Sequence, residues 1–407
     1  MLKRSAVRVG VTIFAASLAL SACGSRGGDS GSGSGGQASG KVATIGVIAP
    51  LSGDLSALGL GIRNSVDLAV KQANESGAIP GWTLQMDAKD DEAKPETGKN
   101  AATALAGDAN VIGVVGTLNS SVAQNVQPVL ASANIVQVSP ANTNPALTKG
   151  ADFATAPKRT YANYFRTCTT DDVQGPFAAQ FLLEKGIKNV ATIHDKKAYG
   201  QGLVDAFTKE FTAKGGKITA ATTINPDDAN FQTAITAVQG GKPQAVYYGG
   251  EYPQAGPLSQ QMKSAGLNVP LMGGDGIYDP KFIELAGATA TGDMATSVGA
   301  PTESLEKGKT FLDAYQAAGY SDAAGAYGAY SYDAANAIIE GLKTSLANAQ
   351  DASSARQATI DAVGKVDVEG VTGKVSFDQY GDSTTRVLTA YEVKDGKWTA
   401  AKTGSVE

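Results

Sequence analysis

The sequence predicts an α/β fold of two lobes, each a parallel-rich sheet flanked by helices. Short β-rich runs alternate with helical stretches from Lys41 onward, a pattern typical of parallel sheets with helices on both faces. The alternation restarts near residue 163, which indicates a second unit of the same kind. Further helices and strands follow the second unit, so we expect the chain to cross between the lobes several times.

The first unit begins with a buried strand over 42–50 (VATIGVIAP) and an amphipathic helix closed by Gly77. A second strand over 82–91 leads to a helix that starts at Pro95, a residue favoured in the first helical turn. The remaining elements of this unit are a strand, a helix and a short strand, expected at 111–116, 120–131 and 135–138.

The second unit repeats the pattern. Its helices and strands are expected at 163–167, 172–186, 189–195, 200–216, 217–224, 230–241, 244–250, 252–266 and 269–274. The C-terminal helices are expected at 305–318 and 324–346, and the last strands near 373–381 and 385–398.

We predict a first lobe from 41–166 plus 298–372 and a second lobe from 167–297 plus 373–407. Open parallel sheets bind ligands at the carboxyl ends of their strands. A site between two such lobes would therefore collect strand-end loops from both of them.

The N-terminal segment predicts export and anchoring. Three basic residues precede an apolar run of about a dozen residues, which is too short to span a membrane and typical of a signal peptide. The ending LSAC resembles the bacterial lipobox, so we expect removal of residues 1–22 and lipidation of Cys23. A plain secreted protein is the alternative. The Gly/Ser-rich residues 23–40 predict a flexible tether spanning roughly 20–25 Å.

Charge and cysteine content narrow the partners. Removing the three basic residues of the signal peptide changes the formal net charge from −5 to −8, which argues against nucleic acid as a partner. The other cysteine, Cys168, has no disulfide partner once Cys23 is acylated, so we expect a small buried side chain. We expect a monomer at the extracytoplasmic face of the cell membrane, held there by its lipid.

The sequence contains no strong signal for an enzyme. The single histidine, His194, ends a strand beside an aspartate, without a nucleophile elbow to partner it, so ordinary hydrogen bonds are the simpler interpretation. The acidic run Asp90-Asp91-Glu92 lacks calcium-loop spacing and more simply forms a solvated strand end. No phosphate-binding glycine motif follows the first strand. We therefore expect no catalysis, no cofactor and no metal site.

Two strand-end loops in the first unit suit an anion. The stretch VVGTLNSSVAQ leads into a turn whose Asn119, Ser120 and Ser121 can cap the next helix. A helix N-terminus offers free N–H donors and a partial positive charge, which suit a carboxylate, although these side chains could serve only as caps. A second loop, VSPANTNPALT, adds the hydroxyl of Thr143.

The second unit contains a candidate for an ammonium group. The stretch LMGGDGIYDP places Asp275 between glycines just after a strand, and a simple turn aspartate is the alternative. Tyr199 and Tyr327 could supply apolar walls with polar tips. An anion-binding loop on one lobe and a carboxylate on the other suit a zwitterion. These features do not indicate which side chain the zwitterion carries.

Long stretches of the chain resemble the periplasmic leucine/isoleucine/valine-binding proteins of ABC importers, over essentially all of residues 41–395. The most specific are GVIAPLSGDLSALGLGIRNSVDLAVKQAN, QGPFAAQFLLEKGIKNVATIHDKKAYGQGL and VYYGGEYPQAGPLSQQMKSAGL. The resemblance implies the type I periplasmic-binding-protein fold and an amino acid, most readily a branched-chain one, captured for an ABC permease.

The resemblance also implies the site. Two loops would hold the ligand carboxylate, Asp275 its ammonium group, and two tyrosines would line the cleft. The residues implied are Leu118, Asn119, Ser120, Ala141, Asn142, Thr143, Tyr199, Asp275 and Tyr327.

Two departures from the family leave the specificity open. Glu251 stands where well-known members have a tyrosine near the ligand, so it could strengthen the ammonium site or favour a more polar ligand. The family disulfide is missing, because its positions correspond to Ala93 and Asn119. The alternatives are a binder of an amide, urea or another small polar solute on the same fold, and a receptor module that senses a ligand without transport.

Overall fold

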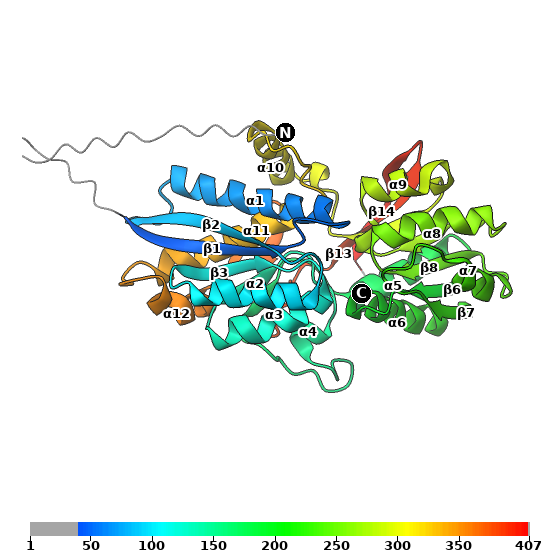
Figure 1. Cartoon of the computed structure of the whole chain (residues 1–407), viewed down its shortest axis with the longest axis horizontal. Coiled ribbons are helices and arrows are strands. Elements are labelled where there is room, and N and C mark those ends of the chain that lie inside the picture. Colours follow the sequence, from blue (N-terminus) through cyan, green and yellow to red (C-terminus); the bar gives the residue numbers. More distant parts are fainter. Residues whose placement is uncertain (1–39, 406–407) are drawn as a thin grey trace, which may run out of the picture. The chain divides into compact units, whose positions relative to one another are not determined.

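Two sheets form the centres of two lobes in the computed structural model, which describes residues 40–405 (Figure 1). The described chain is one compact unit with its own apolar core. The expected α/β architecture with parallel-rich sheets is confirmed.

The first sheet is entirely parallel, in the order β2-β1-β3-β4-β5. Its strands are β1 (Lys41–Ala49), β2 (Trp82–Asp90), β3 (Val111–Gly116), β4 (Val136–Ser139) and β5 (Tyr164–Arg166). Alternate side chains of β1 enter different clusters: Ile45 and Val47 pack with α1 (Ser56–Glu75), and Ile48 packs with α2 (Pro95–Gly107) and α3 (Ser120–Ser132). The apolar run of β1 is explained by helices on both faces of this sheet.

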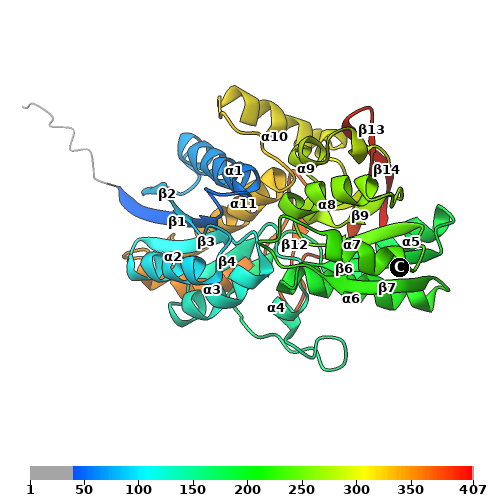
Figure 2. The same ribbon diagram turned by 45° about the vertical axis from the view of Figure 1, so that its right-hand side comes forward.

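The second sheet has the order β14-β13-β10-β9-β8-β6-β7. Its strand pairs are parallel, except that β13 pairs antiparallel with both β10 and β14. Its strands are β6 (Asn189–His194), β7 (Lys217–Thr223), β8 (Ala245–Gly249), β9 (Leu271–Gly273), β10 (Met294–Val298), β13 (Val387–Lys394) and β14 (Lys397–Ser405). In the turned view its strands lie between α8 and α6 (Figure 2). Its helices are α5 (Asp171–Glu184), α6 (Ala198–Ala213), α7 (Gln232–Gln239), α8 (Tyr252–Ser264) and α9 (Pro280–Ala286).

The remaining helices and a two-stranded ribbon complete the fold. The helices are α4 (Ala146–Lys149), α10 (Glu306–Ala317), α11 (Gly328–Ser345) and α12 (Arg356–Val363), and the ribbon pairs β11 (Asp367–Glu369) with β12 (Lys374–Ser376). Four short 3-10 turns are Asp275–Ile277, Gly287–Ala290, Thr302–Ser304 and Ser353–Ala355. The sequence analysis did not predict α4, α9, α12, β10, β11 or β14. The division into lobes at the residues given above stays a prediction.

Three chain segments connect the two sheets: the segment between β5 and α5, the one after β10, and the one between β12 and β13. Cys168 lies in the first of these segments and is a free, fully buried side chain, as expected.

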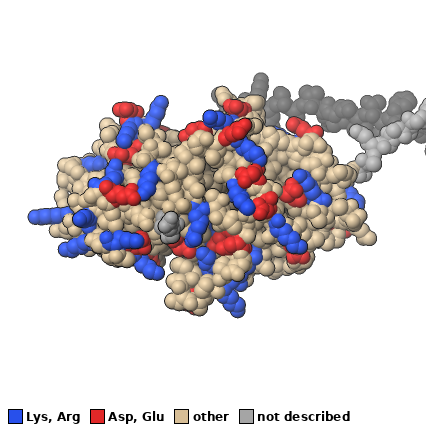
Figure 3. Space-filling view, turned by 180° about the vertical axis from the view of Figure 1, so that it is seen from behind, with Lys and Arg blue, Asp and Glu red and all other residues tan. Residues whose placement is uncertain are grey.

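The surface mixes charges of both signs. Figure 3 shows basic and acidic side chains interspersed over the face seen from behind. Within residues 40–405, no helix is both long and apolar enough to cross a membrane. The predicted signal peptide, Cys23 and nearly all of the tether lie outside the described residues.

Candidate functional site

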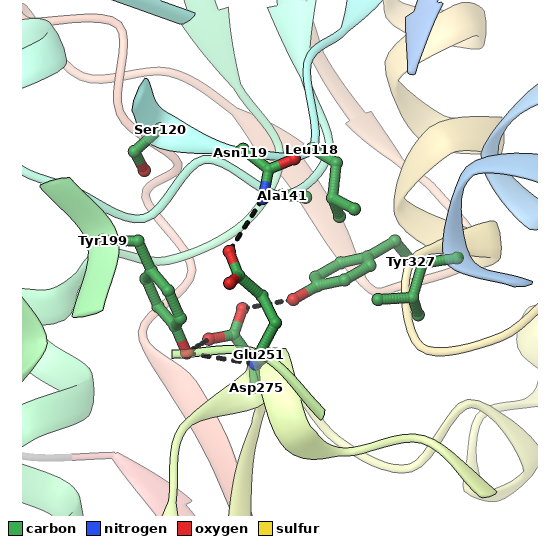
Figure 4. Close-up of a pocket in the computed structure, with 10 residues that line it drawn as sticks. Leu118, Asn119, Ser120, Ala141, Tyr199, Glu251, Asp275 and Tyr327 are labelled. Carbon is green, nitrogen blue, oxygen red and sulfur yellow. Dashed lines mark hydrogen bonds between the residues drawn. The ribbon is translucent and has the colours of Figure 1, made fainter. Parts of the chain in front are cut away.

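One narrow pocket between the lobes collects eight of the ten predicted ligand residues (Figure 4). Its cavity volume is about 20 Å³, so walls from the two lobes nearly meet. Its lining comprises Leu58, Leu118, Asn119, Ser120, Ala141, Tyr199, Glu251, Asp275, Gly276 and Tyr327. The predicted residues Asn142 and Thr143 are not part of this lining.

The loop between β3 and α3 supplies a hydroxyl without a partner. Helix α3 begins at Ser120, and Asn119 is its N-cap residue, yet the Asn119 side chain makes no capping bond. The side-chain oxygen of Ser120 is buried and has no hydrogen-bond partner within the described structure. The interpretation that these side chains serve only as caps is therefore wrong. A hydroxyl and the free N–H groups of a helix end lie together at the pocket.

The loop after β4 reaches the pocket through Ala141 and braces the neighbouring loop. The Asn142 amide donates to the carbonyl oxygen of Leu118 at 2.9 Å, and its oxygen accepts from the hydroxyl of Tyr164 at 3.0 Å. The hydroxyl oxygen of Thr143 is buried and lacks a partner among the described atoms, but Thr143 is not one of the lining residues. Asn142 therefore fixes the spacing of the two loops.

Asp275, on the opposite lobe, is surrounded by hydrogen-bond donors. It follows β9, and its side chain is only 1% exposed. One carboxylate oxygen accepts from the Tyr199 hydroxyl at 2.8 Å and the Gln174 amide at 2.9 Å, and the other accepts from the Tyr327 hydroxyl at 2.8 Å. Burial raises the pKa of Asp275, and the three hydrogen bonds oppose that rise. Donors on three sides fix the orientation of this carboxylate.

Gln174 holds Asp275 from its backbone as well. The side-chain oxygen of Gln174 accepts from the Asp275 N–H at 2.9 Å and from the Thr296 hydroxyl at 2.7 Å. The second acid near this amide is Asp171, whose pKa is raised well above its usual range by burial and by Asp275. The side-chain amide of Gln174 therefore holds Asp275 twice, through its nitrogen on the carboxylate and through its oxygen on the backbone N–H.

Glu251 also lines the pocket, but it already has partners. Its carboxylate accepts from the Asn119 amide at 2.7 Å and from the Lys197 ammonium at 2.9 Å. Burial alone would raise the pKa of Glu251, but Lys197 and these hydrogen bonds outweigh it and leave that pKa below its usual value. The carboxylate is therefore held in its ionised form within the pocket wall.

The sequence analysis missed four residues at or near the pocket. Leu58 lies in a stretch regarded only as a glycine-rich approach to a helix, and Gly276 directly follows Asp275. Gln174 is on a helix noted for family resemblance alone, and Lys197 follows the histidine that drew attention as a possible base. The position of Lys197, two residues after Asp195 at the end of the strand expected at 189–195, was the available signal.

The residues considered for catalysis or metal binding have structural roles. The Nδ1 atom of His194 accepts from the Lys196 N–H at 3.1 Å, as expected for a strand-end histidine. The expectation of a solvated acidic run is wrong for Asp91, which is fully buried and accepts from the Ala93 N–H at 2.8 Å. This hydrogen bond to the Ala93 N–H stabilises the turn in which the Asp91 carboxylate is buried. Among the described residues, no cluster of three or more potential metal ligands occurs.

Known proteins resemble this chain over most of its length. The sequence model of a family described as "Periplasmic binding protein" matches residues 42–397. The Leu/Ile/Val-binding protein BraC3 of Rhizobium johnstonii is 33% identical over 88% of this chain and 94% of its own. Leu/Ile/Val-binding protein homolog 3 of Brucella melitensis is 31% identical over 87% of this chain and 92% of its own.

A solved structure agrees in fold. The branched-chain amino acid transporter substrate binding protein LivJ of Streptococcus pneumoniae, in complex with isoleucine, superposes with a TM-score of 0.79. It is 27% identical and covers 90% of this chain and all of its own.

Proposed function

The chain belongs to the periplasmic binding protein family, and from that premise we propose that it captures an α-amino acid between its lobes for an ABC importer. One observation carries the proposal: a single pocket holds the unpartnered Ser120 hydroxyl at a helix N-terminus and the Asp275 carboxylate on the other lobe. The first suits a carboxylate and the second an ammonium group. An α-amino acid carries both groups on one carbon atom.

Ligand capture closes the cleft in this mechanism. A ligand that contacts Ser120 and Asp275 at the same time binds better when the lobes are together, so it shifts the population toward the closed form. The permease then recognises the closed form. Asp275 is suited to this task, because its surrounding donors fix the carboxylate before a ligand arrives.

A branched-chain side chain is the first candidate for the ligand. The relatives are Leu/Ile/Val-binding proteins, and the neighbour from S. pneumoniae is in complex with isoleucine. In this chain Leu58, Leu118 and the ring of Tyr327 supply apolar surface in the pocket. Burying a branched aliphatic side chain there contributes about 1.5–3 kcal/mol.

A small polar solute, such as an amide or urea, is the second candidate. The Asn119 and Glu251 pair supports it, because both polar side chains are buried in the wall and the Asn119 oxygen has no partner among the described atoms. A ligand with hydrogen-bond donors would satisfy that oxygen, whereas an aliphatic chain would leave it unpaired.

We further propose that the protein is anchored by lipid on Cys23 and works at the extracytoplasmic face of the membrane. The LSAC stretch and the Gly/Ser tether support this placement. A binding protein held in this way keeps freedom to turn its cleft toward the permease. Mass spectrometry of the membrane fraction would test it: acyl chains on Cys23 are expected, and release of Cys23→Ala into the medium is the expected control.

A ligand screen tests the function directly. The chain from Gly40 onward is mixed with each common amino acid, D-forms, acetamide and urea, and its unfolding temperature is measured, because bound ligand stabilises by mass action. We expect the largest increase from leucine, isoleucine or valine. A larger increase from amides or urea favours the second candidate.

A matched pair of variants makes the screen specific. Asp275→Asn removes the ammonium acceptor, and Asp205→Asn makes the same change at an exposed position of α6. We expect the stabilisation by the best ligand to disappear in the first variant and persist in the second. Stabilisation by no amino acid, or equal stabilisation of both variants, would contradict an amino-acid site built on Asp275.

A further inference from the structure

Three helix N-termini meet beside the pocket, and none of their N-cap side chains caps its own helix. Asn119 precedes α3, Lys197 precedes α6 and Glu251 precedes α8. Figure 4 shows the Asn119 amide directed at Glu251. The N-termini of three helices place partial positive charge around one carboxylate, which favours its ionised form.

The bond between Asn119 and Glu251 joins the lobes directly. Asn119 follows a strand of the first sheet and Glu251 follows a strand of the second. The two side chains are each 4% exposed, and 2.7 Å separates the amide nitrogen from the carboxylate oxygen. A shielded hydrogen bond to a charged group is stronger than one between neutral groups. Together with the bond between Tyr327 and Asp275, it links the two lobes across the pocket.

Lys197 controls whether Glu251 can accept that bond as a carboxylate. It approaches the second Glu251 oxygen at 2.9 Å, from outside the pocket lining. Asp195, also on the second lobe, lies 3.8 Å from the Lys197 ammonium and is fully buried. Burial and the neighbouring Glu251 raise the pKa of Asp195, and its carboxylate is farther from the Lys197 ammonium than that of Glu251, so Glu251 is the stronger partner of Lys197. Without Lys197, one buried carboxylate would lack a cation.

We propose that Lys197 is a positioning residue that keeps Glu251 aimed at Asn119, and that the three side chains form an interlobe latch. The latch increases the fraction of ligand-free protein whose lobes are closed. The apparent affinity for ligand rises with that fraction. The inference deepens the proposed function, because the latch residues Asn119 and Glu251 also line the ligand pocket.

Two measurements on the chain from Gly40 onward test the latch. Small-angle scattering gives the radius of gyration without ligand, and calorimetry gives the affinity for L-leucine. Lys197→Met removes the charge, Lys197→Arg keeps it, and Lys196→Met is the matched control, because Lys196 is exposed and bonds Asn225. We expect Lys197→Met alone to expand the ligand-free protein and to weaken L-leucine binding about tenfold.

A second variant separates the latch from a merely structural effect. If Lys197 acts through Glu251 and Asn119, Lys197→Met should cause little further expansion in an Asn119→Ala background. Full additivity of the two expansions, or no expansion of Lys197→Met relative to the control, would overturn the latch. If the wild-type chain does not bind L-leucine, the scattering experiment still decides the latch, while the branched-chain proposal fails separately.

Discussion

The two halves of the pocket differ in how their buried polar groups are hydrogen-bonded. On the first lobe, the Ser120 hydroxyl is buried and has no hydrogen-bond partner among residues 40–405. On the second lobe, the Asp275 carboxylate accepts hydrogen bonds from three side chains. A buried charge needs partners to remain ionised, whereas an unpaired hydroxyl costs only about 1–3 kcal/mol. The charged half is therefore preorganised, and the neutral half is left open for a ligand to complete.

This difference predicts that changes on the second lobe weaken binding more than changes on the first. Three donors already fix the direction of the Asp275 carboxylate, so an arriving ammonium group meets an oriented acceptor. In the proposed site Ser120 would donate one hydrogen bond, and without it the ligand carboxylate would keep the backbone N–H groups of the helix end. The experiments that follow test this asymmetry by the affinity for L-leucine.

The largest effect is expected from Asp275→Asn. The variant leaves the ligand ammonium buried without its counter-charge, so affinity should fall at least 100-fold, or about 3 kcal/mol. Calorimetry measures the loss, and circular dichroism checks that the fold is retained. A change below tenfold would show that Glu251, and not Asp275, holds the ammonium group.

Replacing the two tyrosines should have smaller effects that differ in kind. Tyr199→Phe and Tyr327→Phe each remove one donor to Asp275 and should weaken binding by about 1–2 kcal/mol. Tyr199 belongs to α6 of the second lobe, whereas Tyr327 precedes α11, which packs with α1 of the first lobe. Only Tyr327→Phe removes a bond between the lobes. Scattering should therefore show expansion for this variant alone, and equal radii of gyration for both would remove the distinction.

Ser120→Ala should weaken binding by about 1 kcal/mol and leave the free energy of unfolding nearly unchanged, because its hydroxyl has no partner within the described structure. Thr143→Val is the matched change outside the pocket lining and should leave affinity within a factor of two. Titration calorimetry and urea unfolding on both variants separate the two effects. Equal losses of affinity would mean that Thr143 also reaches the ligand.

The fold was largely predictable because apolar runs and turn residues are local signals. The run VIGVVG became a fully buried strand, and Pro95 begins its helix as expected. The strand Met294–Val298 was missed, since its five residues include two polar ones that are buried only through the tertiary fold.

The candidate site was predictable by position and less so by contact. Eight residues lie in one pocket, but no spacing rule indicates that Asn119 would bond Glu251 across 132 positions. Asn142 shows the same limit: it belongs to the predicted loop, but its amide bonds the carbonyl oxygen of Leu118, and Asn142 is not part of the pocket lining. Such partners are chosen by the packing of the two lobes, which no short stretch of sequence encodes.

The smallest effect on affinity is expected from Asp91→Asn, which contrasts a poorly paired buried acid with the well-paired Asp275. One Asp91 oxygen has no partner among the described atoms, and burial together with Asp90 raises its pKa to about 7. A carboxyl whose pKa is raised on folding stabilises fully below its unfolded value, near 4, and this stability is lost as pH rises through 7. The contribution of Asp91 to the free energy of unfolding should therefore fall between pH 4 and 7.

Asparagine cannot titrate, so Asp91→Asn should reduce the fall in the free energy of unfolding between pH 4 and 7 by about 3 kcal/mol. Urea unfolding at pH 4, 5.5 and 7 measures the slope, and L-leucine affinity should stay within a factor of two, because Asp91 is outside the pocket lining. An unchanged slope would mean that Asp91 is ionised in the folded protein at pH 5.5. The turn that buries it would then have to supply a second donor, as the tyrosines and Gln174 do for Asp275.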